Sequence, residues 1–316
     1  MALIKTTPFG SEKVIEERIS NADLRAYLVG FDLNDEGAME YRWKSFTNIL
    51  LNVLQEFAFA FHEGEVTDNT KTLTKIVEAA RAIYKIEAFQ KVKEICEAGG
   101  CIDDKIEDKY LRRGEFGELI LHLLLRDFHE TIPLISKIYF KDAYGATVHG
   151  FDAVHISPET KTLWLGESKL YLDPKIGLKA LIEDIKQHIK RDYLNDEFTL
   201  ISKKLIHFDN IPEKDYWLGL LSNETKLSNQ IASINIPLLC TYTCDLFSKY
   251  EDENLAEFRE EFNKEISDLK KYFDNNNNHP LKGQLNIILL LFPVKCKKEL
   301  VKRLHSKISL LQEVGR

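Results

Sequence analysis

The sequence predicts an α/β protein in which a mixed β-sheet is flanked by helices and preceded by a mainly helical N-terminal region. Three observations support this prediction. Apolar residues recur at three- and four-residue spacing through much of the first hundred residues, as in amphipathic helices. From about residue 102, short strand-like runs alternate with helical patterns, and two of the later runs are almost entirely apolar. Such alternation is typical of a sheet with helices packed on its faces.

The N-terminal region, residues 1–105, is expected to contain two long helices. Segments 39–63 and 71–100 both have helical periodicity, and the second ends in a pair of glycines that suits a helix stop. This region offers no combination of side chains that indicates catalysis. We therefore expect the chemistry in residues 106–316.

Residues 106–316 are expected to form the sheet and its covering helices. A helix at 112–130 leads into a strand-like run at 133–140. The later elements are, in order, strands at 151–156 and 162–170, a helix at 174–194 with Pro174 near its first turn, a strand at 236–244, a helix at 253–273, a loop at 275–283, a strand at 285–294 and a helix at 297–314.

The composition indicates a globular protein with reduced cysteines. A chain of 316 residues with 44% hydrophobic residues can bury a sizeable core. Its longest apolar run, 287–294, is far shorter than the ~20 residues of a membrane helix, and the first residues lack the features of a secretory signal. The five cysteines include no CxxC pair, so neither a disulfide framework nor a zinc site is indicated. We expect a cytoplasmic protein without a membrane partner.

The net charge of −7 argues against a protein that coats nucleic acid nonspecifically, because such binding needs many Lys and Arg side chains to neutralise phosphates. Binding to a polyanion is therefore expected to be local or assisted. The densest basic stretch, 295–307, fits either a solvated helix face or a contact with a phosphate backbone.

Three charged residues, Asp152, Glu167 and Lys169, stand in two strands that otherwise look apolar. Side chains alternate along a strand, so Glu167 and Lys169 lie on one face. The pairing register decides whether Asp152 joins them there, opposite or diagonal to Glu167, or lies on the other face. The sequence leaves this register open, but the chemistry that follows requires the shared face.

Two neighbouring carboxylates repel each other, and burial raises their pKa values, unless a cation compensates. Mg²⁺ is commonly held by one or two carboxylates together with phosphate oxygens and water. Such a cation lowers the pKa of its bound water and neutralises charge on the phosphate, while Lys169 can orient the attacking water. Asp152, Glu167 and Lys169 are therefore candidate catalytic residues for phosphodiester hydrolysis, with Mg²⁺ or Mn²⁺ as the cofactor.

The alternative is that these charges form solvated ion pairs on an exposed edge strand. The neighbours of Glu167 and Lys169 favour a buried strand, since Leu165 and Leu170 flank the pair. Gly166 adjoins a charge, where a missing side chain would let a phosphate backbone or another strand come close.

The helix that precedes these strands offers further candidates. Glu115, Glu118 and His122 share one side of it at i, i+3 and i+7 spacing. Glu118, enclosed by apolar residues, is the preferred additional metal ligand and catalytic acid. Glu115 suits equally a first-turn acid favoured by the helix dipole, and His122 suits a packing histidine. On the helix after the strands, Asp184 and His188 share a face and could hold the substrate backbone or simply pair within the helix.

The order of a helix with Glu118, strands with Asp152 and Glu167-x-Lys169, and a closing helix resembles the PD-(D/E)XK nuclease superfamily, which has the restriction-endonuclease-like fold. The Pro of the superfamily motif is missing, because Phe151 precedes Asp152. More specifically, HGFDAVHI, LWLGESKLY and IGLKALIEDIKQHI are similar to the HamA family, the nuclease subunits of the Hachiman anti-phage defence system. The likeness is good over residues 114–191 and loose elsewhere.

The resemblance implies a metal-dependent deoxyribonuclease that acts on DNA with a partner helicase, HamB. By position, it implies that Asp152 and Glu167 are metal ligands, Lys169 is the water-orienting base and Glu118 is an auxiliary acid. Residues 1–105 would then be a docking surface for the helicase. A helicase that loads the DNA would also offset the acidic net charge.

Two other functions stay open. A catalytically silent, restriction-like subunit could bind DNA or regulate the helicase complex, although the presence of all three charges speaks against it. A standalone restriction enzyme would need a module that reads sequence, and no helix-turn-helix or similar signature is present. The sequence also leaves open whether cleavage is endo- or exonucleolytic and whether RNA is cut.

Overall fold

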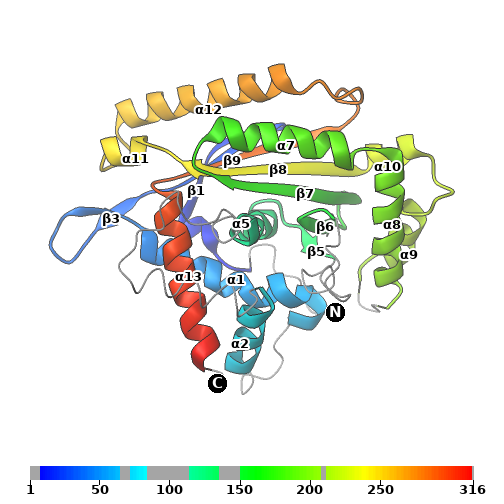
Figure 1. Ribbon diagram of the computed structural model, residues 1–316, viewed down its shortest axis with the longest axis horizontal. Coiled ribbons are helices and arrows are strands. Elements are labelled where there is room, and N and C mark those ends of the chain that lie inside the picture. Colours follow the sequence, from blue (N-terminus) through cyan, green and yellow to red (C-terminus); the bar gives the residue numbers. More distant parts are fainter. Residues whose placement is uncertain (1–7, 65–71, 84–113, 135–149, 208–210, 315–316) are drawn as a thin grey trace, which may run out of the picture.

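A computed structural model of the chain describes residues 8–64, 72–83, 114–134, 150–207 and 211–314. Within them lies a seven-stranded sheet with the order β1-β2-β9-β8-β7-β6-β5 (Figure 1). Its strands are β1 (Ile15–Asn21), β2 (Leu24–Val29), β5 (Ile132–Pro133), β6 (Ala153–Ser157), β7 (Thr162–Tyr171), β8 (Ile234–Thr243) and β9 (Asn286–Val294).

The sheet is mixed, as the alternation of patterns predicts. β2, β9, β8 and β7 run parallel to one another, whereas β1, β6 and β5 pair in antiparallel fashion at the two sides. β8 is buried along nearly its whole length and β9 over most of it, which explains why both read as continuous apolar runs.

Helices cover both faces of this sheet. α7 and α12 lie on one face, and α5, α1 and α13 lie on the other (Figure 1). α2 packs against α1 and α13, and α8, α9 and α10 lie together at one end. The helices are α1 (Trp43–Gly64), α2 (Thr72–Ile83), α5 (Gly114–Asp127), α7 (Pro174–His188), α8 (Arg191–Leu205), α9 (Lys214–Leu220), α10 (Leu227–Ala232), α11 (Leu246–Lys249), α12 (Ala256–Asn276) and α13 (Lys297–Val314), with a 3₁₀ turn at Ser11–Lys13.

The start of α7 is set by local sequence. The Asp173 side chain caps the helix by accepting hydrogen bonds from the backbone N–H groups of Lys175 and Ile176, at 2.7 and 3.4 Å. Pro174 stands in the first turn, where its missing N–H costs nothing. A single helix was expected over 174–194, but α7 ends at His188 and α8 begins at Arg191.

The N-terminal part differs from the prediction in one respect. Besides the expected helix α1, it forms β1 and β2, which join the main sheet, and a separate hairpin of β3 (Phe31–Leu33) and β4 (Met39–Tyr41). β1 is an edge strand with only one buried residue, so its polar side chains hide the strand pattern. Residues before 105 therefore supply strands as well as helices, and the predicted boundary at 105 lies outside the described residues.

Other expected elements agree with the structure where it describes them. α5, β6, β7, β8, α12, β9 and α13 fall within the predicted ranges or a few residues from them. Of the run expected at 133–140, β5 takes the first residue, and residues 135–140 lie outside the described part. No helix in the described part has both the length and the apolar character that crossing a membrane requires.

Candidate active site

The register of β6 and β7 brings the three predicted charges to one face of the sheet. Ala153 pairs with Gly166, so Asp152, the residue before β6, stands opposite Glu167. Lys169 follows two residues later on the same face. The pairing register is therefore the one that the proposed chemistry requires.

Asp152 is tied to β7 by hydrogen bonds. Its Oδ2 accepts from the backbone N–H of Ser168 at 2.9 Å and from the Ser168 hydroxyl at 3.0 Å. These bonds tie the carboxylate to Ser168, the residue after Glu167, although Asp152 lies just outside the regular strand. Ser168, which alternation points to the other face, was not predicted to belong to the site.

Glu167 is a buried acid with other negative charges near it. Its residue is 4% exposed. Burial raises the pKa of its carboxyl group well above the usual value, the negative charges of Asp152 and Asp184 raise it further, and Lys169 opposes them in part. Additional positive charge at this position would stabilise the ionised carboxylate.

Lys169 remains an ammonium ion in this setting. Its Nζ lies 2.5 Å from Oδ2 of Asp184 on α7. Burial by itself lowers the pKa of Lys169, but the neighbouring carboxylates, Asp184 first, outweigh it and the net pKa is raised. Lys169 is therefore suited to donating hydrogen bonds and balancing charge.

The two predicted auxiliary residues of α7 both reach the strand pair. His188 Nδ1 lies 2.5 Å from Oε1 of Glu167, and Asp184 bonds Lys169 as described. Helical spacing places Asp184 and His188 on one side of α7, and α7 packs on β7 and β8. The structure thus gives these residues contacts with the candidate catalytic groups themselves.

α5 lies on the opposite face of the sheet. A Cβ atom added to Gly166 would lie 2.9 Å from a methyl carbon of Leu121 on α5, and one added to Gly117 would lie 3.2 Å from the Ser168 hydroxyl. The missing side chain of Gly166 therefore allows a helix, rather than a phosphate backbone, to come close.

The two predicted acids of α5, Glu115 and Glu118, lie in different surroundings. Glu118 is 7% exposed, and its negative charge is among those that raise the pKa of Glu167. Glu115 is half-buried in the first turn of the helix, where an acid is favoured by the helix dipole. Glu118 is thus within electrostatic reach of the site.

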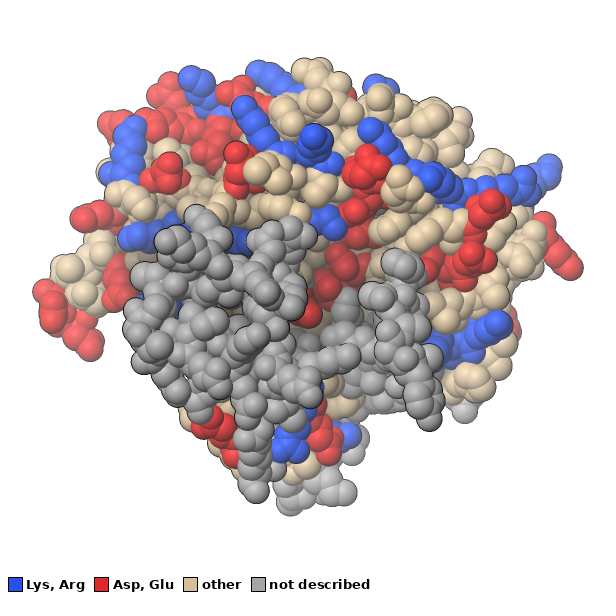
Figure 2. Space-filling view, in the orientation of Figure 1, with Lys and Arg blue, Asp and Glu red and all other residues tan. Residues whose placement is uncertain are grey.

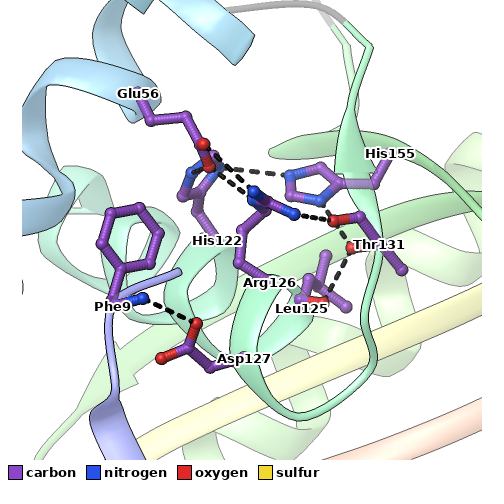
Figure 3. Close-up of polar contacts among 8 residues, drawn as sticks. All are labelled: Phe9, Glu56, His122, Leu125, Arg126, Asp127, Thr131 and His155. Carbon is purple, nitrogen blue, oxygen red and sulfur yellow. Dashed lines mark hydrogen bonds and ion pairs between the residues drawn. The ribbon is translucent and has the colours of Figure 1, made fainter. Parts of the chain in front are cut away.

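His122 belongs to a different cluster (Figure 3). Its Nε2 lies 3.0 Å from Glu56 of α1, and its Nδ1 lies 3.2 Å from Nε2 of His155 on β6. Arg126 and Thr131 extend this buried network, in which His155 also bonds the Thr131 hydroxyl at 2.8 Å. The packing alternative for His122 describes its contacts better than a ligand role.

Sequence reasoning missed Tyr193, which stands in the first turn of α8. Burial raises the pKa of its hydroxyl, and the charges of Glu197, Glu167 and Asp152 raise it further. Tyr193 is therefore close to the carboxylates. The helix periodicity gave no sign of this, because the chain bends between α7 and α8.

The surroundings of the site are mixed in charge. Figure 2 shows acidic atoms set back below α7, and both acidic and basic atoms over α7 and α12 above them. The basic stretch predicted at 295–307 begins at the end of β9, and Lys297 Nζ lies 5.8 Å from the ring centre of Tyr171 at the end of β7. A cavity of about 600 Å³ between α7, β8 and α12 is lined by Tyr242 and Glu265, and none of the three predicted charges borders it.

Within the described residues, no group of three or more His, Cys, Asp or Glu side chains is arranged to hold a metal ion. Asp152 and Glu167, opposed across β6 and β7, supply two carboxylates. Their hard carboxylate oxygens suit Mg²⁺ or Mn²⁺ rather than a soft metal.

Comparison with known proteins identifies the family. The curated proteins contain no match to the chain. The sequence model of the family described as HamA matches residues 7–308, which is nearly the whole chain and includes the N-terminal strands as well as β6, β7 and α7. The chain therefore belongs to the HamA family, a family of the Hachiman anti-phage defence system.

Proposed function

We propose that this chain is a metal-dependent deoxyribonuclease that hydrolyses DNA phosphodiester bonds as the effector subunit of a Hachiman complex, with a HamB-like helicase as its partner. The observation that carries the proposal is the register that sets Asp152 opposite Glu167, with Lys169 on the same face. Membership of the HamA family supports it.

The carboxylates fit a divalent cation. Glu167 is buried beside other negative charges, and its raised pKa would fall if a cation balanced them. Asp152 and Glu167 would hold Mg²⁺ or Mn²⁺, with Glu118 adding negative charge from α5. Two carboxylates suffice, because phosphate oxygens and water usually complete the shell of Mg²⁺. Such a cation supplies an activated water and neutralises charge on the phosphate.

Lys169 would then stabilise charge and orient the attacking water. Its ammonium group stays protonated because of Asp184, so it donates hydrogen bonds rather than accepting a proton. Asp184 also restricts where the ammonium can lie. Lys169 would thereby keep a positive charge close to the carboxylates of Asp152 and Glu167.

The partner helicase would bring DNA to a site whose acidic surroundings repel it. The net charge of −7 and the acidic atoms around the site oppose approach of DNA at physiological salt. A helicase would deliver a strand held on its own surface and raise its effective concentration at the site. We assign the N-terminal region to contact with the helicase. We assign the basic start of α13 to contact with the phosphate backbone of DNA.

The test is cleavage of plasmid DNA by the full chain with Mg²⁺ or Mn²⁺, with and without the partner helicase. Glu167→Gln and Lys169→Met should each reduce the rate at least 100-fold, on the order of magnitude seen when a group that stabilises the transition state is removed. Glu159→Gln is the matched control, because Glu159 is an exposed acid in the turn of the same hairpin.

Three outcomes decide between functions. Cleavage by wild type and control but not by the two site variants supports the proposal. Equal cleavage by all four proteins would show that another group does the chemistry. No cleavage under any condition, together with binding of the helicase, would favour the catalytically silent regulatory subunit.

A further inference from the structure

Two side chains of α7 contact the two charged residues of β7, Glu167 and Lys169. Asp184 and His188 lie one turn apart on α7, and they contact Lys169 and Glu167 respectively, each at 2.5 Å. The Glu167 side chain is 5% exposed and that of His188 is 20% exposed. Water therefore has little access to the bond between them.

The imidazole ring is itself held in place. It stacks on Tyr193, with ring centres 4.5 Å apart and planes 10° apart. The Phe151 ring meets it edge-on at 5.6 Å and also meets Tyr193 edge-on at 6.0 Å. Phe151 directly precedes Asp152, so this aromatic cluster adjoins both proposed metal ligands.

The bend between α7 and α8 creates the stack. In an uninterrupted helix, residues five apart point in different directions and do not stack. Because α7 ends at His188 and α8 starts at Arg191, the chain turns and lays Tyr193 against the histidine. These aromatic contacts therefore depend on the turn between the two helices, and they leave the His188 ring few alternative orientations.

We propose that His188 is the positioning residue of Glu167: its Nδ1–H donates to Oε1 and orients the carboxylate for the cation that Asp152 and Glu167 share. The inference rests on the proposed function. A carboxylate that is already oriented loses less side-chain freedom when it binds a cation. Partners that orient metal ligands in this way typically change metal affinity 10–100-fold.

The role differs from that of a catalytic residue. His188 acts through Glu167 and needs no contact with DNA. Loss of its hydrogen bond should therefore weaken cation binding even when no DNA is present. A side chain that restores a donor at the position of Nδ1 should restore the affinity, whereas a side chain of similar size without a donor should not.

The experiment measures Mn²⁺ binding to the full chain without DNA, by titration calorimetry and by the paramagnetic resonance signal of free Mn²⁺. His188→Leu should weaken binding about 10–100-fold. His188→Asn, whose side-chain amide stands in for Nδ1–H, should stay within about threefold of wild type, since it keeps one donor of the same geometry. Tyr193→Leu should weaken binding by less than His188→Leu, and Glu159→Gln should not change it.

Circular dichroism and thermal unfolding establish that each variant folds. If His188→Leu does not fold, His188→Gln replaces it, because its amide reaches the position of Nε2 instead of Nδ1. Equal Mn²⁺ affinity of wild type and His188→Leu, or of His188→Leu and His188→Asn, would overturn the inference.

Failure of the inference can be told apart from failure of the proposed function. If Glu167→Gln abolishes Mn²⁺ binding and His188→Leu leaves it unchanged, the cation site stands and the role of His188 is wrong. If Glu167→Gln binds Mn²⁺ as tightly as wild type, or wild type binds none, the cation site itself is wrong and both fall.

Discussion

Replacing Arg126 by Met tests the buried ion pair that joins α1 to α5 (Figure 3). Arg126 is 1% exposed. Its Nε and Nη2 donate to the two carboxylate oxygens of Glu56 at 2.6 and 3.3 Å, and its Nη1 donates to the backbone oxygen of Thr131 at 2.5 Å. Met retains much of the apolar volume of the side chain but has no charge and no donors.

The expected loss of stability comes from the groups that Arg126 leaves without a partner, Glu56 and the Thr131 oxygen. Removing one partner of a buried ion pair costs about 3–5 kcal/mol, because the other charge is left uncompensated. Glu56 has a 15% exposed side chain and keeps His122 as a neighbour, which favours the lower end of that range. The buried oxygen of Thr131 also loses a donor, at a cost of about 1–3 kcal/mol. We expect the free energy of unfolding to fall by about 4 kcal/mol.

The loss should depend on pH in one direction. Burial alone would raise the pKa of Glu56, but His122 and Arg126 together lower it below the usual value. A lowered pKa in the folded state gives stability that is present above the unfolded pKa of about 4.5 and disappears as the pH falls through the folded pKa. The difference between wild type and Arg126→Met should therefore be complete at pH 7 and should shrink below about pH 4.5.

Urea unfolding followed by tryptophan fluorescence measures these differences. The double variant Glu56→Leu/Arg126→Met should regain the part of the loss that comes from the uncompensated charge of Glu56, whereas the Thr131 oxygen still lacks its donor. Arg303→Met is the matched control, since Arg303 pairs with Glu299 at the surface of α13 and should contribute less than about 1 kcal/mol. A loss below about 1 kcal/mol for Arg126→Met, or a double variant less stable than Arg126→Met, would refute the reasoning.

Three further predictions use other parts of the structure. Burial raises the pKa of Glu197 to about 7, so the penalty of the ionised acid grows as the pH rises. The free energy of unfolding of Glu197→Gln should therefore equal that of wild type at pH 4 and exceed it by about 3 kcal/mol at pH 8. Equal urea midpoints at pH 8 would contradict this. Gly166→Ala should lose about 1–3 kcal/mol through overpacking against α5, whereas Gly219→Ala, with open space around it, should be neutral or slightly stabilising in the same titration. Cys240 is buried with a raised pKa and Cys296 is half-buried, so peptide mass spectrometry should detect alkylation of Cys296 before that of Cys240. Faster labelling of Cys240 would contradict the packing of β8.

Long apolar runs determined much of the sheet. β8 and β9 were predictable because central strands with two covered faces carry nearly continuous apolar sequence. β1 was not, because it lies at an edge where most of its side chains reach solvent and no alternation survives. Its pairing with β2, and that of β2 with β9, depends on contacts between distant parts of the chain.

Part of the candidate site was also predictable. The two-residue spacing of Glu167 and Lys169 fixes them to one face of a strand, whatever the rest of the chain does. In the same way, the four-residue spacing of Asp184 and His188 marked them as neighbours on one side of a helix. These inferences hold because they depend only on local backbone geometry.

The sequence by itself thus determined which residue types could act and which of them share an element. Only the tertiary structure decided that Asp152 stands opposite Glu167, that α7 rather than α5 covers this face, and that Tyr193 stacks on His188. The physical reason is that strand register, helix placement and the bend after His188 arise from packing between elements, and local periodicity contains no information about which elements pack together.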